Sequence, residues 1–145
     1  MKKMHPAKKY LMQIEKIDSM IENKKAEKEY WQTVATGTTM QLSEKVQTSS
    51  NGEKMTNAVL KILKVQEELD ECIVRLNNER KEIISVLEQL NAKEYDLLHK
   101  VYVQYFTLKE YMFMKHISYS SVTFLHGQAL NNVLKILERM KEPNE

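Results

Sequence analysis

One run of regularly spaced apolar residues constrains this chain more than any other feature of its sequence. Between Met55 and Leu90 the series recurs at alternating steps of four and three, and only Gln66 and Arg80 within it are polar. Its members are Met55, Val59, Ile62, Gln66, Leu69, Ile73, Leu76, Arg80, Ile83, Leu87 and Leu90. A heptad pattern of this length is typical of a coiled coil. A helix with such a stripe needs a partner in water, so the pattern predicts a long helix packed on another.

A second, less regular stripe precedes it and supplies that partner. Its members are Tyr10, Ile14, Ile17, Ile21, Lys24, Lys28 and Trp31. Pro6 suits the first turn of a helix, where a missing N–H costs nothing. We therefore expect antiparallel helices over 7–36 and 54–91. The two lysines in the stripe are interpreted as lying over the partner helix on their aliphatic stems, rather than as an anion site.

The segment 37–53 differs in composition from the helices on either side. It holds Gly37 and Gly52 and is rich in serine and threonine, which predicts a long loop. The hairpin and this loop together define a first predicted domain over 1–92.

The second helix also has more apolar residues than one partner can cover. The surplus residues are Leu60, Leu63, Val65, Cys72, Ile84 and Val86. This surplus predicts self-association, with a homodimer as the expected state. Cys72, the only cysteine, is interpreted as a buried structural thiol within this face.

The heptad spacing ends at Leu90. A second predicted domain covers 93–145. A short helix is expected over 94–106, followed by a second that ends near Lys115. Thr107 and Glu110 have the spacing of a capping box, and Ser118 has the position of an N-cap. The last helix is expected to run from Tyr119 towards Pro143. Its inward residues are predicted to be Val122, Leu125, Ala129, Val133, Ile136 and Met140.

The segment 102–130 resembles region 4 of sigma factors, which is a helix-turn-helix unit. The shared pattern is a Thr-Leu-x-Glu helix start, Ile-Ser before the recognition helix, a Val four residues later and a late Ala-Leu. The matching residues are Thr107, Leu108, Glu110, Ile117, Ser118, Val122, Ala129 and Leu130. The wider chain is similar to small phage and prophage proteins of Gram-positive bacteria, including ArpU-like and RinA-like late transcription regulators. The resemblance implies an all-α fold, with the helical hairpin followed by a three-helix unit of the sigma region 4 type.

The chain departs from that pattern at three places. Helix-turn-helix units usually carry Ala where Met112 stands and Gly where His116 stands, because Gly accepts a left-handed turn. Between His116 and Leu134 there is also no lysine or arginine. Polar uncharged side chains can read base edges, but the affinity that basic residues supply is missing from this stretch.

The resemblance implies a nucleic-acid-binding surface at the start of the last helix. Ser118 would cap that helix and direct its N-terminus at a phosphate. The residues of the predicted surface are Ser118, Tyr119, Ser120, Ser121, Thr123, Phe124 and Gln128, with Lys100, Lys109 and Lys115 as phosphate contacts. About three such contacts would give a shallow salt slope, about −2 to −3 on log–log axes.

Other classes of function lack a sequence signal. The histidines and Cys72 have no metal-ligand spacing, and no glycine-rich phosphate loop exists. The carboxylates alternate with lysines in the manner of a solvated helix surface. We therefore expect no enzyme, no cofactor and no metal. No apolar run approaches the length of a membrane span, and one cysteine favours a reducing compartment, so a cytoplasmic protein is expected.

Two functions remain open from the sequence. The first is a phage-type transcription regulator whose helix-turn-helix contacts promoter DNA, RNA polymerase or both. The alternative is a protein-interaction module, directed at RNA polymerase or another regulatory protein, that keeps the helix-turn-helix shape without binding DNA. The uncharged last helix favours the second, and the resemblance favours the first.

Overall fold

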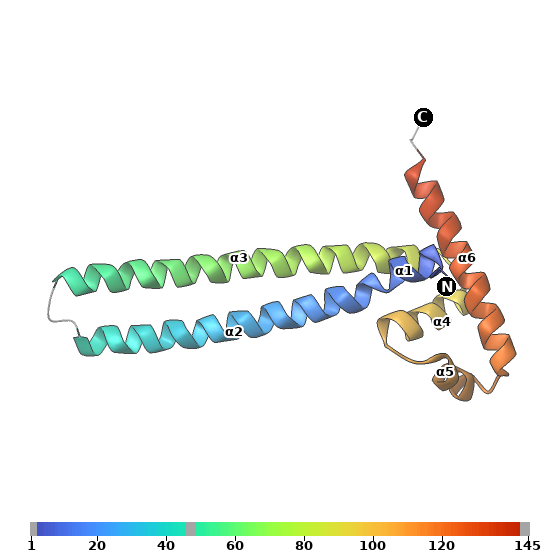
Figure 1. The fold of residues 1–145 in the computed structure, drawn as a ribbon, viewed down its shortest axis with the longest axis horizontal. Coiled ribbons are helices and arrows are strands. Elements are labelled where there is room, and N and C mark those ends of the chain that lie inside the picture. The colour runs from blue at the N-terminus through green and yellow to red at the C-terminus, as the bar shows by residue number, and fades with distance from the viewer. Residues whose placement is uncertain (1–2, 46–48, 143–145) are drawn as a thin grey trace. The chain divides into compact units, whose positions relative to one another are not determined.

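A computed structural model describes the backbone of residues 3–45 and 49–142, and the side chains of 3–37 and 56–142. The described residues form helices and no strand, so the prediction of an all-helical chain is confirmed (Figure 1). Two compact units divide the chain: residues 19–77 form one, and residues 1–18 with 78–145 form the other. The predicted division at residue 92 does not coincide with this grouping, because the first helical turns pack with the C-terminal helices.

Two long helices, α2 (Gln13–Lys45) and α3 (Ser49–Leu87), supply the unit of residues 19–77. Within it they run antiparallel and side by side (Figure 1). The prediction of a loop over 37–53 is wrong for its described residues, since α2 continues to Lys45 and α3 begins at Ser49. A glycine inside a helix costs only about 1 kcal/mol relative to alanine. Gly37 and Gly52 therefore do not suffice to end these helices.

The apolar seam of this unit follows the heptad series. Ile62, Leu69 and Leu76 of α3 are buried, as is Ile21 of α2. Leu60 and Leu63, by contrast, remain more than half exposed, and Cys72 is half-buried rather than buried. Met55 lies outside the residues whose side chains are described.

The two lysines in the stripe of α2 make ion pairs. Lys28 Nζ lies 2.6 Å from Asp70 Oδ1 of α3, across the pair of helices. Lys24 Nζ instead lies 3.3 Å from Glu27 Oε2 on its own helix. Both lysines are half-buried, so their stems lie against the protein and their ammonium groups bind carboxylates.

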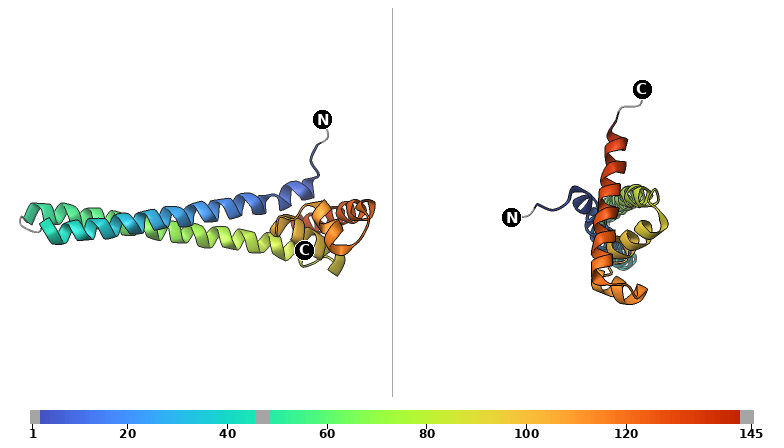
Figure 2. Two further views of the ribbon diagram at one scale, coloured as in Figure 1. Left: turned by 90° about the horizontal axis from the view of Figure 1, so that it is seen from below. Right: turned by 90° about the vertical axis from the view of Figure 1, so that its right-hand side faces the viewer.

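The predicted continuous helix from residue 7 is interrupted near its start. The short helix α1 (Pro6–Leu11) has Pro6 in its first turn, and a turn at Met12 separates it from α2. Ala7 and Leu11 are fully buried. His5 caps α1 by accepting a hydrogen bond from the Ala7 amide, and its Nε2 lies 2.9 Å from Asn131 Oδ1 of the last helix. α1 thereby lies beside the last helix, α6 (Figure 2).

The C-terminal helices are α4 (Ala92–Leu98), α5 (Leu108–Lys115) and α6 (Tyr119–Lys141). The predicted helix over 94–106 is shorter and less regular than expected. After Leu98 the chain forms one turn of π-helix, η1 (His99–Val103). Tyr105 then adopts a positive φ of 65°, a conformation that side chains with a Cβ seldom take.

A small apolar core joins these helices. Leu97, Tyr111 and Val122 are buried at its centre, with Leu108 and Leu125 packed around them. Further along α6, Ala129, Val133 and Ile136 are buried, as predicted. Met140 is 61% exposed, so its predicted inward position is wrong. It lies in the last turn of α6, where the described residues offer it no buried surroundings.

Candidate functional site

The connection between α5 and α6 is short and tightly held. His116 adopts the left-handed conformation, with φ 55° and ψ 44°, at the position where helix-turn-helix units usually carry glycine. The next residue donates a hydrogen bond from its amide to Met112 O at 3.2 Å. Left-handed backbone costs a non-glycine residue about 1 kcal/mol. The hydrogen bond from the Ile117 amide to Met112 O closes the turn with His116 in this conformation.

Both predicted caps are present in the structure. Thr107 Oγ1 accepts a hydrogen bond from the Glu110 amide at 3.1 Å. Glu110 Oε1 accepts one from the Thr107 amide at 3.2 Å, which completes the capping box. Ser118 Oγ accepts a hydrogen bond from the Ser121 amide at 3.1 Å. These caps fix where α5 and α6 begin.

The predicted surface of α6 faces solvent. The exposed members are Ser118, Tyr119, Ser120, Ser121, Thr123, Phe124 and Gln128. Val122 and Ala129, at 0% exposure, occupy the inward side of the same turns. Phe124 is 74% exposed. The burial of one side of α6 thus orients the opposite, uncharged side outwards.

Two of the three predicted lysines are paired with one carboxylate. Lys100 Nζ lies 2.6 Å from Asp96 Oδ1, and Lys115 Nζ lies 3.2 Å from Asp96 Oδ2. Tyr111 donates its hydroxyl hydrogen bond to the same Asp96 Oδ2 at 2.9 Å. Lys109 forms no ion pair with another described residue. Of the three lysines, it alone is not held by Asp96.

Asp96 belongs to the candidate site through these contacts, and the sequence analysis did not identify it. Partial burial raises the pKa of its carboxyl, but hydrogen bonds from Lys100, Tyr111 and Lys115 outweigh this, and the net pKa is lowered. The pKa of Tyr111 rises to about 12, first through burial and then through the hydrogen bond to this carboxylate. Asp96 and Lys100 have the i,i+4 spacing of a helical ion pair, and that spacing was a signal in the sequence.

A groove of about 580 Å³ connects these groups to the start of α6. Its lining residues include Asp96, Tyr111, Lys115, Ile117 and Ser121. The lining thus combines charged side chains, the apolar Ile117 of the turn and Ser121 of the predicted surface.

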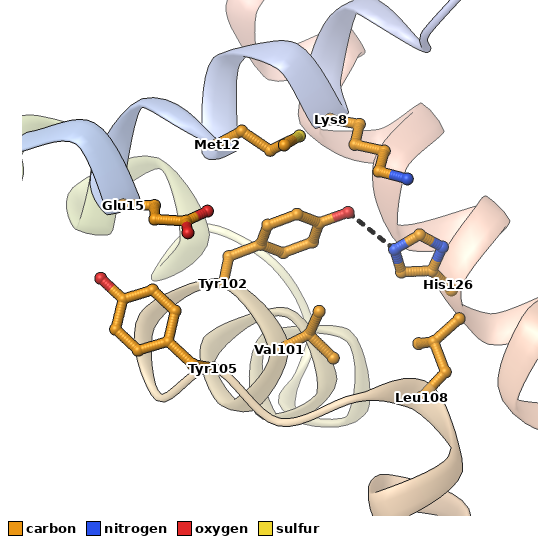
Figure 3. Close-up of a pocket in the computed structure, with 8 residues that line it drawn as sticks. All are labelled: Lys8, Met12, Glu15, Val101, Tyr102, Tyr105, Leu108 and His126. Carbon is orange, nitrogen blue, oxygen red and sulfur yellow. Dashed lines mark hydrogen bonds between the residues drawn. The ribbon is translucent and has the colours of Figure 1, made fainter.

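A second cavity, of about 210 Å³, lies between α1, the start of α2, η1, α5 and α6 (Figure 3). Tyr102 Oη and His126 Nε2 are 2.9 Å apart, and their rings stack. Burial raises the pKa of Tyr102 to about 12. Burial, with the charges of Lys8 and His5, lowers the pKa of His126. The hydrogen bond and the ring stacking between Tyr102 and His126 join η1 to α6.

One carboxylate is almost fully buried. Glu94 is 2% exposed, and Asn132 Nδ2 of α6 donates to both its oxygens, at 3.0 and 2.8 Å. Asn91 Oδ1 accepts from the Glu94 amide and so caps α4. This network fixes α4 against α6, and sequence reasoning did not find it because its members are far apart in the chain.

The described residues hold no group of three or more His, Cys, Asp or Glu side chains placed to bind a metal ion. None of the described helices has the length and apolar character that crossing a membrane requires. Comparisons with known protein families, curated proteins and solved structures returned no match to this chain.

Proposed function

We propose that the chain is a transcription regulator of the phage or prophage type. In this proposal, α5 and α6 act as a helix-turn-helix of the sigma region 4 kind, and α6 approaches the major groove of promoter DNA. The long helices of residues 19–77 form the hairpin that precedes this unit. Through this unit the protein acts on promoter DNA, on RNA polymerase or on both.

One observation carries the proposal: α6 begins at a capped N-terminus and presents an uncharged polar face beside it. Ser120, Ser121 and Gln128 are exposed, and serine and glutamine side chains can donate to and accept from base edges. A helix N-terminus favours a nearby phosphate through its amide groups and dipole. The connection over 116–118 between α5 and α6 has the short length that is typical of a helix-turn-helix.

The ion pairs at Asp96 lower the expected electrostatic part of binding. Lys100 and Lys115 would have to leave Asp96 to contact phosphate fully. With Lys109 as the main contact of the three, the log–log salt slope should be about −1 rather than about −3. Asp96→Asn should release both lysines, steepen the slope towards about −3 and tighten binding at low salt.

The direct test is fluorescence anisotropy of phage late-promoter duplexes with the full chain, from 50 mM salt upwards. Ser121→Glu and Gln128→Glu should each weaken binding about tenfold or more, because each places a carboxylate against the DNA. Gln89→Glu makes a matched change of charge at an exposed residue outside α6 and should leave the affinity unchanged. Absence of binding at 50 mM salt, or equal affinities for the three variants, would contradict the proposal.

A second candidate function is protein interaction without DNA binding. Phe113 is 70% exposed and Phe124 is 74% exposed, and exposed aromatic side chains are enriched at protein interfaces. The missing basic residues on α6 also favour it. Surface plasmon resonance with purified bacterial RNA polymerase distinguishes the two functions. Polymerase binding that Phe113→Ser or Phe124→Ser abolishes, with no DNA binding, would select the second.

A further inference from the structure

The helix α3 carries a second heptad series on the side opposite its buried seam. Leu60, Lys64, Glu67, Glu71 and Val74 recur at steps of four, three, four and three. At about 100° per residue, this outer series lies half a turn from the buried one. All five side chains are exposed, with Leu60 at 57% and Val74 at 59%. α3 therefore has one seam covered by α2 and another left open.

The order of residue types in the outer series is nearly symmetric about its middle. Apolar side chains stand at both ends, Lys64 and Glu71 are next, and Glu67 is at the centre. None of these three charged side chains forms an ion pair with another described residue, whereas the neighbouring Asp70 is paired with Lys28. Leu63, also on this side of the helix, is 52% exposed and widens the apolar end.

We propose that the outer series is a homodimer interface in which two copies of α3 pack antiparallel, with the two-fold axis at Glu67. In that register Leu60 lies against Val74 of the second copy, and Lys64 faces Glu71 of the second copy. The two-fold axis repeats each contact, as an isologous interface requires. A surface that is self-complementary in both charge and apolar character thus gains two ion pairs and two apolar contacts.

The charge order distinguishes this arrangement from the alternatives. A parallel pair in register would set Lys64 against Lys64 and Glu71 against Glu71, and both contacts are repulsive. The antiparallel pair keeps only one like-charge contact, between the two Glu67 carboxylates on the axis. That single repulsion makes Glu67 a distinctive probe, because removing its charge should strengthen the dimer.

The size of the interface sets its expected strength. Val74 lies fourteen positions after Leu60 in the sequence, so the seam is about 21 Å long at 1.5 Å per residue. Contacts of this extent fall in the weak, transient class of interfaces. We expect a dissociation constant on the order of 100 µM, which is reached in concentrated samples.

Sedimentation velocity of the full chain between about 5 and 500 µM tests the inference. Lys64→Glu and Glu71→Lys should each raise the dissociation constant about tenfold, since each sets like charges together twice per dimer. The double variant restores opposite charges and should return to within about threefold of the wild type. Glu67→Gln should lower the dissociation constant. Lys25→Glu, at an exposed position on α2, is the matched control and should change nothing.

Cysteine cross-linking tests the register independently of affinity. In a Cys72→Ser background under copper-phenanthroline oxidation, Glu67→Cys should form a disulfide-linked dimer by itself. Leu60→Cys should cross-link only when it is mixed with Val74→Cys. Circular dichroism confirms that each variant remains helical. A chain that stays monomeric at 500 µM, a double charge variant that does not recover, or self-cross-linking of Leu60→Cys would overturn the proposal.

Discussion

The C-terminal helices α4, α5 and α6 and the long helices of residues 19–77 are stabilised in different ways. The C-terminal helices are short, begin at side-chain caps such as Thr107 and Ser118, and meet at a common core. The long helices share one buried seam, exemplified by Leu69 and Leu76, and tolerate Gly37 within α2. A short helix needs its ends defined and its core packed, whereas a long one needs mainly a periodic apolar stripe.

The largest effect should come from breaking the stripe. Leu76→Pro removes a backbone hydrogen bond and a side chain that is only 3% exposed. It should destabilise residues 19–77 by about 3 kcal/mol or more. Thermal melts followed by circular dichroism measure the loss, and amide exchange should show that the C-terminal helices stay protected. Lys25→Ala, at an exposed position on α2, is the control and should leave the melt unchanged. A Leu76→Pro melt identical to the wild type would refute the seam.

The next largest loss of stability should come from truncating a core side chain of the C-terminal helices. Leu97 is fully buried among α4, α5 and α6, and Leu97→Ala leaves a cavity. The expected loss is about 2–5 kcal/mol of unfolding free energy, measured by urea denaturation. Phe124→Ala, at a 74% exposed position, should cost less than about 0.5 kcal/mol. Equal effects for the two variants would show that this core does not hold the helices together.

Replacing a threonine in each region should have a smaller effect on stability and compares the two regions directly. Thr107→Ala removes the capping box of α5 and should cost about 1 kcal/mol. Thr33 lies inside α2, where its hydroxyl bonds to Glu29 O, and Thr33→Ala should be neutral or slightly stabilising, because alanine is the better helix former. Urea denaturation of both variants measures the difference. A cost at Thr33 as large as that at Thr107 would contradict the contrast between the regions.

The smallest effect should be a dependence on pH through His126. Burial, followed by the charges of Lys8 and His5, lowers its pKa in the folded protein. The unfolded chain therefore binds the proton more readily, so this contribution to stability is present above about pH 6.5 and is lost as the pH falls below it. Denaturation at pH 7.5 and 5.5 should show a smaller decrease for His126→Asn than for the wild type. An equal decrease in both would exclude the effect.

Features that depend on neighbouring residues were predicted correctly from the sequence, whereas contacts between residues far apart in the chain were not predicted. Thr107 and Ser118 were predicted as caps because a cap depends on residues three positions away. The seam of α3 followed from periodicity alone. The positions at which α2 ends and α3 begins were not predicted correctly, because glycine and serine destabilise a long helix without ending it. The His5–Asn131 contact and the buried Glu94–Asn132 pair join residues far apart in the chain, and no local pattern reports such contacts.

The candidate surface on α6 likewise combines features that the sequence predicted with contacts that it did not. Its exposed residues on α6 were predicted from helical spacing, since Val122 and Ala129 define the inward side. The ion pairing of the lysines was not predicted, because Lys115 at the end of α5 binds Asp96 of α4, which is distant in the sequence. The π-helical turn after Leu98 brings no sequence signature of its own. Helical spacing thus predicted which side chains of α6 are exposed, whereas the pairing of Lys115 with Asp96 depends on the tertiary structure.

Whether α6 contacts DNA is the central question, and NMR titration of the ¹⁵N-labelled full chain with a promoter duplex at 50 mM salt tests it most directly. The account predicts that amide shifts change mainly between Ser118 and Gln128, with a smaller change near Lys109. Residues 19–36 of α2 should stay unperturbed. Shifts that do not change, or that change throughout the chain without a maximum at the start of α6, would contradict it.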